Sequence, residues 1–380
     1  MQKIYIQEQV MLDSVCKDLS HAKVLAIDTE FVRTRTLYPK LGLLQISDGK
    51  QLVLIDPLAV DDLSAFWQLL MDANIVKVLH ACSEDLEVFL TAANCRPVNL
   101  IDSQIIMSFL GHGLSMGYAA MVKYYLDIEL DKSESRTDWT ARPLSARQLE
   151  YAQADVEYLF QLYPIITQQL SDKGWLEAAQ QDSELLIERK FTAIDENQLY
   201  RTVKMSWRLT SAQLYRLKML AIWRFQQAQK KDLPIGFIAK DHTLIVIAQM
   251  NPQTINIMNR LDGIELFDVR RNGKAMLALL KAIEQDHSDN FPDKIQRLDE
   301  YPGYKQIFQQ VKSFITTVAK NSDLLPENLA SRKQINQYLA WHFKLNNHAV
   351  DKSSVDILLG WRYTLFGEKL TELGKNQFTH

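Results

Sequence analysis

Cysteine is scarce in this chain of 380 residues, which contains only Cys16, Cys82 and Cys95. Three scattered cysteines form neither a disulfide framework nor a CxxC metal knuckle, so we expect reduced thiols. Long apolar runs are missing too, because Lys, Asp or Gly interrupts each of them within about ten residues. The N-terminal sequence MQKIYIQEQV lacks the apolar core and cleavage site of a secretory signal. We therefore expect a cytoplasmic protein without membrane contact.

An overall excess of positive charge is also absent. The net charge is −3, which argues against a general polyanion binder. Residues 201–260 nevertheless carry ten Lys and Arg side chains against two Asp, so the remaining chain is acidic. This distribution indicates phosphate attraction in one part and metal chemistry in another, or else only a solvated helical face. The sequence contains no GxxxxGK phosphate-binding loop, so ATPase or helicase activity has no support.

A chain of this length is expected to form two or three domains. Residues 24–33 are apolar and then acidic, as in a buried strand, while the apolar runs 42–49 and 51–58 join across a Gly-containing turn, as in a hairpin. Alternating strand and helix patterns continue to about residue 190, which predicts an α/β domain with a mixed sheet and flanking helices. Later residues have helical spacing, although TLIVIA at 243–248 fits either a strand or a buried helix.

Acidic side chains stand at the edges of several expected elements of the α/β domain. Asp28 and Glu30 are two residues apart on one strand, so their side chains leave the same face. Asp85 lies in the first turn of the helix that follows the next strand, and Tyr151 and Asp155 are four apart on one helical face. Each acid alone is commonly a cap or a solvated side chain, but together they predict one site.

Carboxylate oxygens are hard ligands that suit Mg²⁺ or Mn²⁺ better than Zn²⁺. Two such ions about 4 Å apart can activate water and stabilise the leaving oxygen of a phosphodiester. A phenol with a pKa near 10 is protonated at neutral pH, so we expect Tyr151 to aim the attacking water rather than act as a base. The pattern predicts phosphodiester hydrolysis with two divalent metal ions as cofactors.

A polar segment just before the last acidic motif carries Lys132, Arg136 and Arg142 around Trp139. Cations interleaved with an aromatic ring suit a single-stranded 3′ end, through phosphate contacts and base stacking. The alternative is a surface loop folded around one buried tryptophan. For His80, a hydrogen-bonded structural role is favoured.

The motifs as a group resemble a known family. DTEF at 28–31, HACSED ending in Asp85 and YAQAD at 151–155 resemble the three exonuclease motifs of the DEDD superfamily, in its Tyr-containing subgroup. TEFVRTRTLYPKLGLLQIS (29–47) and LDKSESRTDWTARPLSARQLEYAQADVEYL (130–159) are similar to ribonuclease D, as is LLGWRYTLFGEKL near the C-terminus. The resemblance spans nearly the whole chain, and its helical parts resemble HRDC modules, the second in a degenerate form.

The resemblance implies an RNase H-like α/β exonuclease domain at 1–190, an HRDC domain at 208–290 and a second, degenerate HRDC-like domain at 295–375. It implies that Asp28, Glu30, Asp85 and Asp155 are the metal ligands and that Tyr151 positions the water. Asp102, expected to be a helix N-cap, lies near the site in the family's IDxQ pattern. The HRDC-like modules are expected to supply RNA grip, and the basic candidates there are Arg216, Lys218 and Arg224.

The leading hypothesis is a monomeric, metal-dependent 3′→5′ exoribonuclease that releases nucleoside 5′-monophosphates and trims RNA, chiefly 3′-extended tRNA precursors. A DNA 3′→5′ exonuclease is the second hypothesis, because two-metal chemistry does not depend on the 2′-hydroxyl. An inactive RNA-binding adaptor is the third, and it requires the loss of an acid that this sequence retains.

Overall fold

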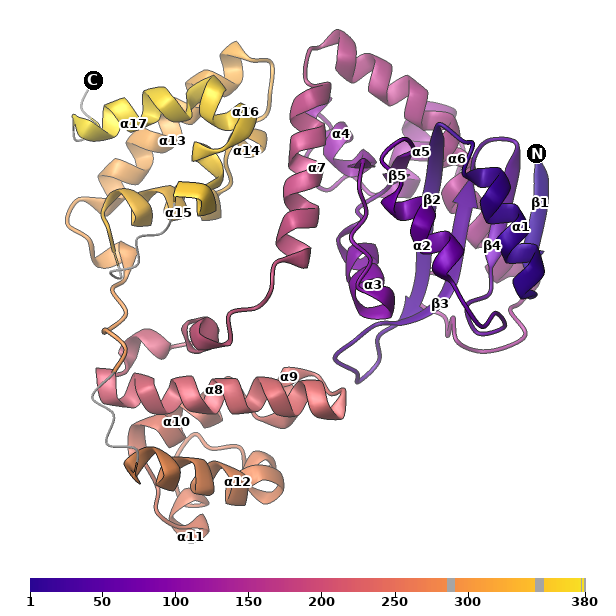
Figure 1. The fold of residues 1–380 in the computed structure, drawn as a ribbon. Coiled ribbons are helices and arrows are strands. Elements are labelled where there is room, and N and C mark those ends of the chain that lie inside the picture. Colours follow the sequence, from indigo (N-terminus) through magenta and orange to yellow (C-terminus); the bar gives the residue numbers. More distant parts are fainter. Residues whose placement is uncertain (286–290, 346–351, 377, 379–380) are drawn as a thin grey trace.

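The chain folds into an α/β unit followed by two helical units (Figure 1). The structure is a computed structural model that describes residues 1–285, 291–345, 352–376 and 378. Among these residues, none of the helices combines the length and the apolar character that a membrane crossing requires. All three cysteines are buried, free thiols.

The α/β unit is built on one mixed sheet of six strands, in the spatial order β1-β4-β3-β2-β5-β6. The central strands β2, β3 and β4 are antiparallel neighbours, while β1 pairs with β4, and β5 with β2 and β6, in parallel. The predicted mixed sheet and the hairpin of β3 and β4 are confirmed. The strands are β1 (Gln2–Ile6), β2 (Val24–Val32), β3 (Lys40–Ser47), β4 (Gln51–Ile55), β5 (Val76–Leu79) and β6 (Leu100–Asp102).

Helices cover both faces of the sheet, because the buried strands carry apolar side chains on each face. The core on one face includes residues of α1, α2 and α3, and the core on the other face includes residues of α4, α5 and α6. Helix α7 packs beside β6 and leads away to the helical units (Figure 1). The helices are α1 (Gln9–Leu19), α2 (Ser64–Met71), α3 (Ser83–Ala93), α4 (Ser103–Phe109), α5 (Tyr118–Leu126), α6 (Ala146–Asp172) and α7 (Leu176–Phe191).

The first helical unit has a hydrophobic core of its own, separate from the cores of the sheet. The segment TLIVIA lies within α10, which resolves its ambiguity in favour of a helix. Leu244, Ile247 and Ala248 are buried at helical spacing in this core. The unit contains α8 (Ser211–Lys231), α9 (Ile235–Ile238), α10 (Asp241–Met250), α11 (Ile255–Met258) and α12 (Leu266–Gln285).

A cap of α8 ties the first helical unit to the α/β unit. Asp232 ends α8 in the left-handed conformation, and its carboxylate accepts hydrogen bonds from the backbone N–H groups of Leu37 and Tyr38, at 3.0 and 3.1 Å. These two residues lie in the loop between β2 and β3. The first helical unit is therefore joined to the α/β unit by the chain connection and by this contact with the β2–β3 loop.

The second helical unit is integrated more deeply. Its buried side chains continue the core that α4 and α6 form on the sheet, and Trp361 lies edge-on to Phe109, with ring centroids 5.3 Å apart. Its helices are α13 (Tyr304–Asn321), α14 (Pro326–Leu329), α15 (Arg332–His342), α16 (Gly360–Arg362) and α17 (Glu368–Lys375).

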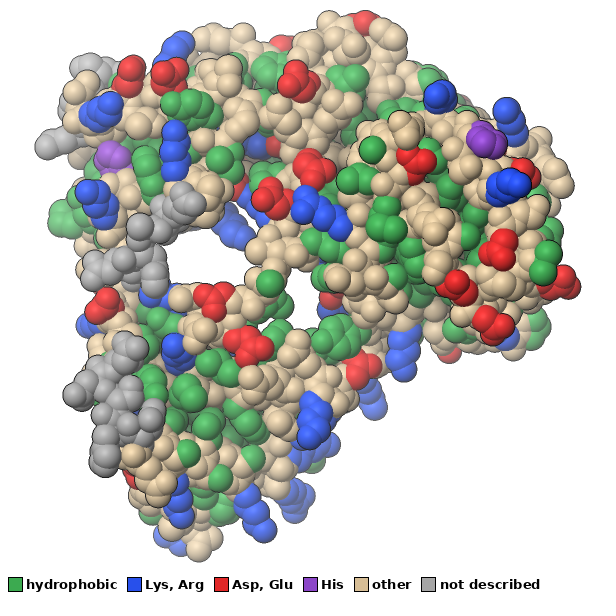
Figure 2. All heavy atoms as spheres, in the orientation of Figure 1, with side chains coloured by type: hydrophobic (Ala, Val, Ile, Leu, Met, Phe, Trp, Pro, Cys, Tyr) green, Lys and Arg blue, Asp and Glu red, His purple; other side chains and the backbone are tan. Residues whose placement is uncertain are grey.

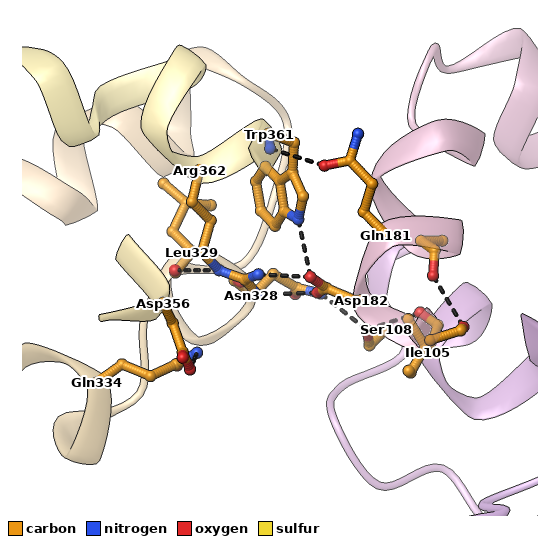
Figure 3. Close-up of polar contacts among 12 residues, drawn as sticks. Ile105, Ser108, Gln181, Asp182, Asn328, Leu329, Gln334, Asp356, Trp361 and Arg362 are labelled. Atoms are coloured by element: carbon orange, nitrogen blue, oxygen red, sulfur yellow. Dashed lines mark hydrogen bonds and ion pairs between the residues drawn. The ribbon is translucent and has the colours of Figure 1, made fainter. Parts of the chain in front are cut away.

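Polar contacts surround this apolar junction (Figure 3). The guanidinium of Arg362, which is 6% exposed, forms a bidentate ion pair with Asp182 of α7, at 2.5 and 2.8 Å. The indole N–H of Trp361 donates to the same carboxylate at 2.9 Å, and the Asn328 amide donates to Ser108 of α4 at 2.8 Å. Ion pairs and core continuity together fix the second helical unit against the α/β unit.

Candidate metal centre

Strand β2 carries the first two acids into the centre of the α/β unit. Its pairing with β5 ends at Ala26, while its pairing with β3 continues through Asp28 and Glu30 to an irregularity just after Glu30. Asp28 and Glu30 alternate with buried Ile27 and Thr29, so both carboxylates leave the face that α6 covers. The local sequence thus places two acids on one face of β2, just beyond the point where its pairing with β5 ends.

Helix α6 supplies the third acid. A capping box formed by Ser145 and Gln148 begins this helix, which then packs over β2 and β3. One carboxylate oxygen from each of Asp28, Glu30 and Asp155 lies within 4.8 Å of the others. Asp155 therefore lies beside two acids that precede it by more than a hundred residues. A cation can bridge carboxylate oxygens at these distances.

Asp85 lies next to this triad rather than within it. It belongs to the first turn of α3 and is 6% exposed, and its carboxylate accepts a 2.5 Å hydrogen bond from the hydroxyl of Thr29. Thr29 stands between Asp28 and Glu30 on β2, so the bond ties the start of α3 to the strand that carries the other acids. The four predicted ligands therefore lie on adjoining elements, three of them with oxygens in mutual reach.

Burial and mutual repulsion perturb all four carboxyl groups. Burial raises the pKa of Glu30 to about 9, with further contributions from Asp155 and Asp85. Burial raises the pKa of Asp155 to about 7 and that of Asp85 to about 6, although the Thr29 hydrogen bond opposes the shift at Asp85. The pKa of Asp28 is raised well above its ordinary value by burial and by the three neighbouring acids. Without a counter-charge the cluster resists full ionisation, so its donor set fits a divalent cation.

Tyr151 borders the cluster from the preceding turn of α6. Burial and the charges of Asp155, Glu30 and Asp28 raise its pKa, so its hydroxyl keeps its proton and can donate a hydrogen bond. A cavity of about 360 Å³ reaches Tyr151 and Asp155 between α6 and the loop that precedes it. Its lining residues are Leu130, Asp131, Glu134, Arg147, Glu150, Tyr151, Ala154 and Asp155.

The segment before α6 contains both exposed and buried members of the predicted RNA-contacting group. Lys132 and Arg136 are exposed. Trp139 is 1% exposed, so it does not offer its ring for base stacking as predicted. Its backbone packs against Gly42, where an added Cβ would lie 2.5 Å from the Trp139 carbonyl oxygen. Around Trp139, the structure thus agrees with the alternative prediction of a surface loop folded around one buried tryptophan.

The prediction of an RNA contact for Arg142 is also corrected. Its guanidinium pairs with Asp56 through two contacts of 2.7 Å and donates to the carbonyl oxygens of Gly42 and Trp139, at 2.6 and 2.9 Å. The Asp56 carboxylate is buried at the end of β4. Burial by itself raises its pKa, but the hydrogen bonds from Arg142, Tyr5 and the Leu58 N–H, together with the charge of Arg142, lower it overall. Arg142 therefore anchors the loop to the sheet.

In the first helical unit, one of the three predicted basic residues is unavailable to RNA. Arg224 is 7% exposed and donates to Asp241 at 2.8 Å and to the carbonyl oxygen of Ala239 at 3.0 Å. Arg216 is partly buried and donates to the carbonyl oxygen of Ala248 at 2.8 Å, whereas Lys218 is partly exposed. A basic side chain on an amphipathic helix can therefore bind groups within the fold as readily as it binds an RNA phosphate.

Two further predictions concern residues near the cluster. Both ring nitrogens of His80 have partners, Ser103 and the Met116 carbonyl oxygen, at 2.9 and 3.0 Å, which confirms a structural role. The Asp102 carboxylate accepts from the N–H of Gln104 at 2.8 Å, which confirms the N-cap of α4. It also holds the turn before α3, a contact that the sequence does not reveal.

Three protein-family models match the chain. They are 3′-5′ exonuclease over residues 3–171, HRDC domain over residues 213–280, and Ribonuclease D, C-terminal HRDC domain, over residues 302–370. The mixed sheet, the acidic cluster and these matches define a 3′–5′ exonuclease with appended HRDC domains.

Full-length relatives narrow this class. Ribonuclease D of Escherichia coli K12 is 41% identical over 362 residues, covering 95% of this chain and 96% of the relative, and ribonuclease D of Cronobacter turicensis is 40% identical over 365 residues, covering 96% and 98%. The crystal structure of Escherichia coli RNase D, described as an exoribonuclease involved in structured RNA processing, matches with a TM-score of 0.94 and 39% identity over 99% of both chains. The chain belongs to the ribonuclease D family and is an exoribonuclease.

Proposed function

We propose that this exoribonuclease trims structured RNAs from their 3′ ends, 3′-extended tRNA precursors among them, and releases nucleoside 5′-monophosphates. The meeting of Asp28, Glu30 and Asp155 within 4.8 Å, beside Asp85 and Tyr151, is the observation that carries the proposal. The processing of structured RNA stated for the similar Escherichia coli enzyme supports this substrate class.

The metal ligands in this proposal are Asp28, Glu30, Asp85 and Asp155, which hold two divalent cations, Mg²⁺ or Mn²⁺. Four acids supply the hard oxygen donors that these ions prefer, and cations relieve the repulsion that raises the carboxyl pKa values. When bound, such ions polarise the scissile phosphate and stabilise the leaving oxygen. The acids lie on β2, α3 and α6, so the packing of these three elements sets the positions of the ligand oxygens.

Tyr151 has the role of positioning the attacking water. Its hydroxyl holds its proton because burial and nearby acids raise its pKa, so it donates to the water and fixes the direction of attack. Its ring lies 6.0 Å, centroid to centroid, from the buried ring of Trp139. This packing restricts the tyrosine, and we propose that Trp139 contributes to the site in this way rather than by stacking on a base.

A surface of the first helical unit is proposed to grip the RNA. Phe237 is 44% exposed with the Lys240 ammonium 5.8 Å from its ring centroid, and Phe267 is 60% exposed with the Arg271 guanidinium 5.5 Å away. These two ring–cation pairs are adjacent, since the backbone N–H of Lys240 donates to the Asp268 carboxylate of α12 at 2.7 Å. Lys and Arg side chains gather along the lower edge of this unit (Figure 2). Exposed rings beside cations suit single-stranded RNA.

This grip surface, defined by Phe237, Lys240, Phe267 and Arg271, takes the place of Arg224 among the proposed RNA contacts. Exposed Lys132 and Arg136 remain proposed contacts beside the cavity at Tyr151. We also propose domain boundaries at 1–190, 208–290 and 295–375, a monomeric chain and a cytoplasmic location.

A time course on a 3′-extended tRNA tests the proposed function, with Mg²⁺ and Mn²⁺ compared and the released products identified by chromatography. We expect stepwise shortening from the 3′ end and nucleoside 5′-monophosphates in both metals. A single DNA strand of matched sequence tests the second hypothesis. Faster loss of the DNA strand, or internal cleavage of the tRNA, contradicts the proposal.

A further inference from the structure

Gln45 of β3 is a buried amide that the fold leaves without partners. Its side chain is 0% exposed, and neither its Oε1 nor its Nε2 atom has a hydrogen-bond partner among the described residues. An unpaired buried amide destabilises a fold, because its hydrogen bonds to water are lost on folding and not replaced. Other buried polar side chains of the sheet, such as Thr29, Ser47 and Lys77, have hydrogen-bond partners, so the unpaired amide calls for a reason.

The register of the sheet sets this amide beside the metal centre. Gln45 is the cross-strand partner of Asp28 on β2, and on its other side it faces Leu54 of β4. Directly opposed residues of antiparallel strands project their side chains to the same face, with Cβ atoms about 5 Å apart. The Gln45 side chain therefore lies on the α6 face of the sheet, directly beside the side chain of Asp28.

Apolar side chains flank Gln45 on two sides of this face, and the hydroxyl of Ser47, two residues further along β3, bonds to Met1 and Gly49. Leu43 and Leu54 belong to the hydrophobic core that also contains Ala152 and Val156 of α6. Asp28 is the polar side chain that the register brings to its side. The buried amide therefore stands beside Asp28 at the edge of the acidic cluster under α6.

We propose that Gln45 is a positioning residue of the metal centre, whose Nε2 amide donates to the Asp28 carboxylate, directly or through one buried water, when Asp28 holds a cation. The inference rests on the proposed role of Asp28 as a metal ligand. Carboxylates that bind metals are themselves hydrogen-bonded, and these bonds fix which oxygen faces the ion. The unsatisfied amide is then a donor held ready for the metal-bound form of the site.

A substitution of Gln45→Met tests this with two readouts, because methionine keeps a similar volume and removes both polar atoms. We expect the melting temperature in EDTA to stay equal or rise, since an unpaired amide is removed. We expect the affinity for Mn²⁺, measured by calorimetry without RNA, to fall about tenfold. A merely structural glutamine gives the opposite pattern, with a lower melting temperature and unchanged affinity.

Gln148 provides a matched control, because it is a buried glutamine whose amide is satisfied. Its Nε2 donates to Thr137 at 3.1 Å, and its Oε1 accepts from the Ser145 N–H at 2.9 Å. Gln148→Met is therefore expected to lower the melting temperature and leave Mn²⁺ affinity unchanged. The two variants should move the two readouts in different directions.

A double-mutant cycle separates failure of this inference from failure of the proposed function. If Asp28→Asn binds Mn²⁺ as the wild type does, Asp28 is not a ligand and the proposed function itself is wrong. If Asp28→Asn weakens binding, adding Gln45→Met should weaken it no further. An additive loss, or unchanged affinity in Gln45→Met alone, overturns the inference. Should Gln45→Met and Gln45→Leu both fail to fold, it is overturned too, because it requires the amide to add no stability to the metal-free chain.

Discussion

The carboxylate of Asp102 accepts a 3.0 Å hydrogen bond from the backbone N–H of Cys82, the residue that immediately precedes α3. The same carboxylate accepts from the N–H of Ala81 at 2.8 Å, and Ala81 has a φ of 56°, in the left-handed region. An alanine in this conformation needs such support. Asp102 therefore fixes the turn that places Asp85 beside β2.

Asp102→Ala is expected to displace Asp85 and to lower kcat about a hundredfold, with little change in KM, because small misplacements of reacting groups are costly. Steady-state kinetics on a short RNA measures the effect. Asp62→Ala is the control, since Asp62 accepts a similar bond from the Ser64 N–H at the start of α2 but is exposed. Unchanged kcat in Asp102→Ala would remove Asp102 from this role.

Asp28→Asn and Asp155→Asn are each expected to reduce RNA hydrolysis by about a thousandfold, because either change removes a charge that holds the cations. RNA affinity, measured by filter binding, should persist. Asp131→Asn at the rim of the cavity is the matched control and should retain turnover. Near-normal turnover in Asp28→Asn would contradict the metal centre, and absence of bound Mn²⁺ in the wild type would favour an inactive adaptor.

Stability without metal is expected to fall as pH rises. The carboxyl pKa values of Asp85, Asp155 and Glu30 are about 6, 7 and 9, all above their ordinary values. The folded chain therefore binds more protons than the unfolded chain, and deprotonation between about pH 6 and pH 9 removes stability. In EDTA we expect the melting temperature to drop by at least about 2 °C across this range.

The same experiment has two internal checks. Asp155→Asn, which removes one titrating acid, should flatten the decline in EDTA. Added Mn²⁺ should oppose the decline, since the cation replaces the lost protons and binds better as the acids ionise. A melting temperature in EDTA that rises from pH 6 to pH 9 would contradict the raised pKa values.

Arg362→Ala is expected to destabilise the junction of the second helical unit by about 3–5 kcal/mol, because it leaves Asp182 without its buried partner. Denaturant unfolding and limited proteolysis measure the change. Lys173→Ala breaks the more exposed pair with Asp323 and should change stability by about 0–1 kcal/mol. Equal effects of the two substitutions would argue against the Arg362 contact.

Lys240→Glu combined with Arg271→Glu is expected to raise KM for RNA and to reduce the slope of log affinity against log salt by about 0.7 for each cation removed. Fluorescence anisotropy at several salt concentrations measures this slope. Lys17→Glu combined with Lys23→Glu makes the same charge change on exposed residues near α1. If both double variants reduce the slope equally, the effect is one of net charge and the grip surface is wrong.

Local patterns were sufficient to predict the central sheet and the cluster of acids. The hairpin followed from two apolar runs, and the side-by-side position of Asp28 and Glu30 followed from strand geometry. Strand β1 was not anticipated, because five residues at a sheet edge carry a weak pattern and depend on pairing with β4.

Roles that depend on distant partners were beyond sequence reasoning. A phosphate contact for Arg142 was one of two predictions for its segment, but Asp56, 86 residues away in sequence, pairs with its guanidinium. Trp139 is buried because Gly42 permits close packing. Gln45 left one faint signal, a single amide within the apolar run LGLLQIS, which acquires meaning only from its register with Asp28.

The core shared by the α/β unit and the second helical unit has a consequence for biosynthesis. Phe109 and Trp175 both lie against Trp361, so their rings lack this partner on a nascent chain until Trp361 has emerged from the ribosome. The first helical unit, with a core of its own, is able to fold in the interval. We expect a nascent exonuclease domain to expose apolar surface and to depend on chaperones until the second helical unit has been translated and packs against it.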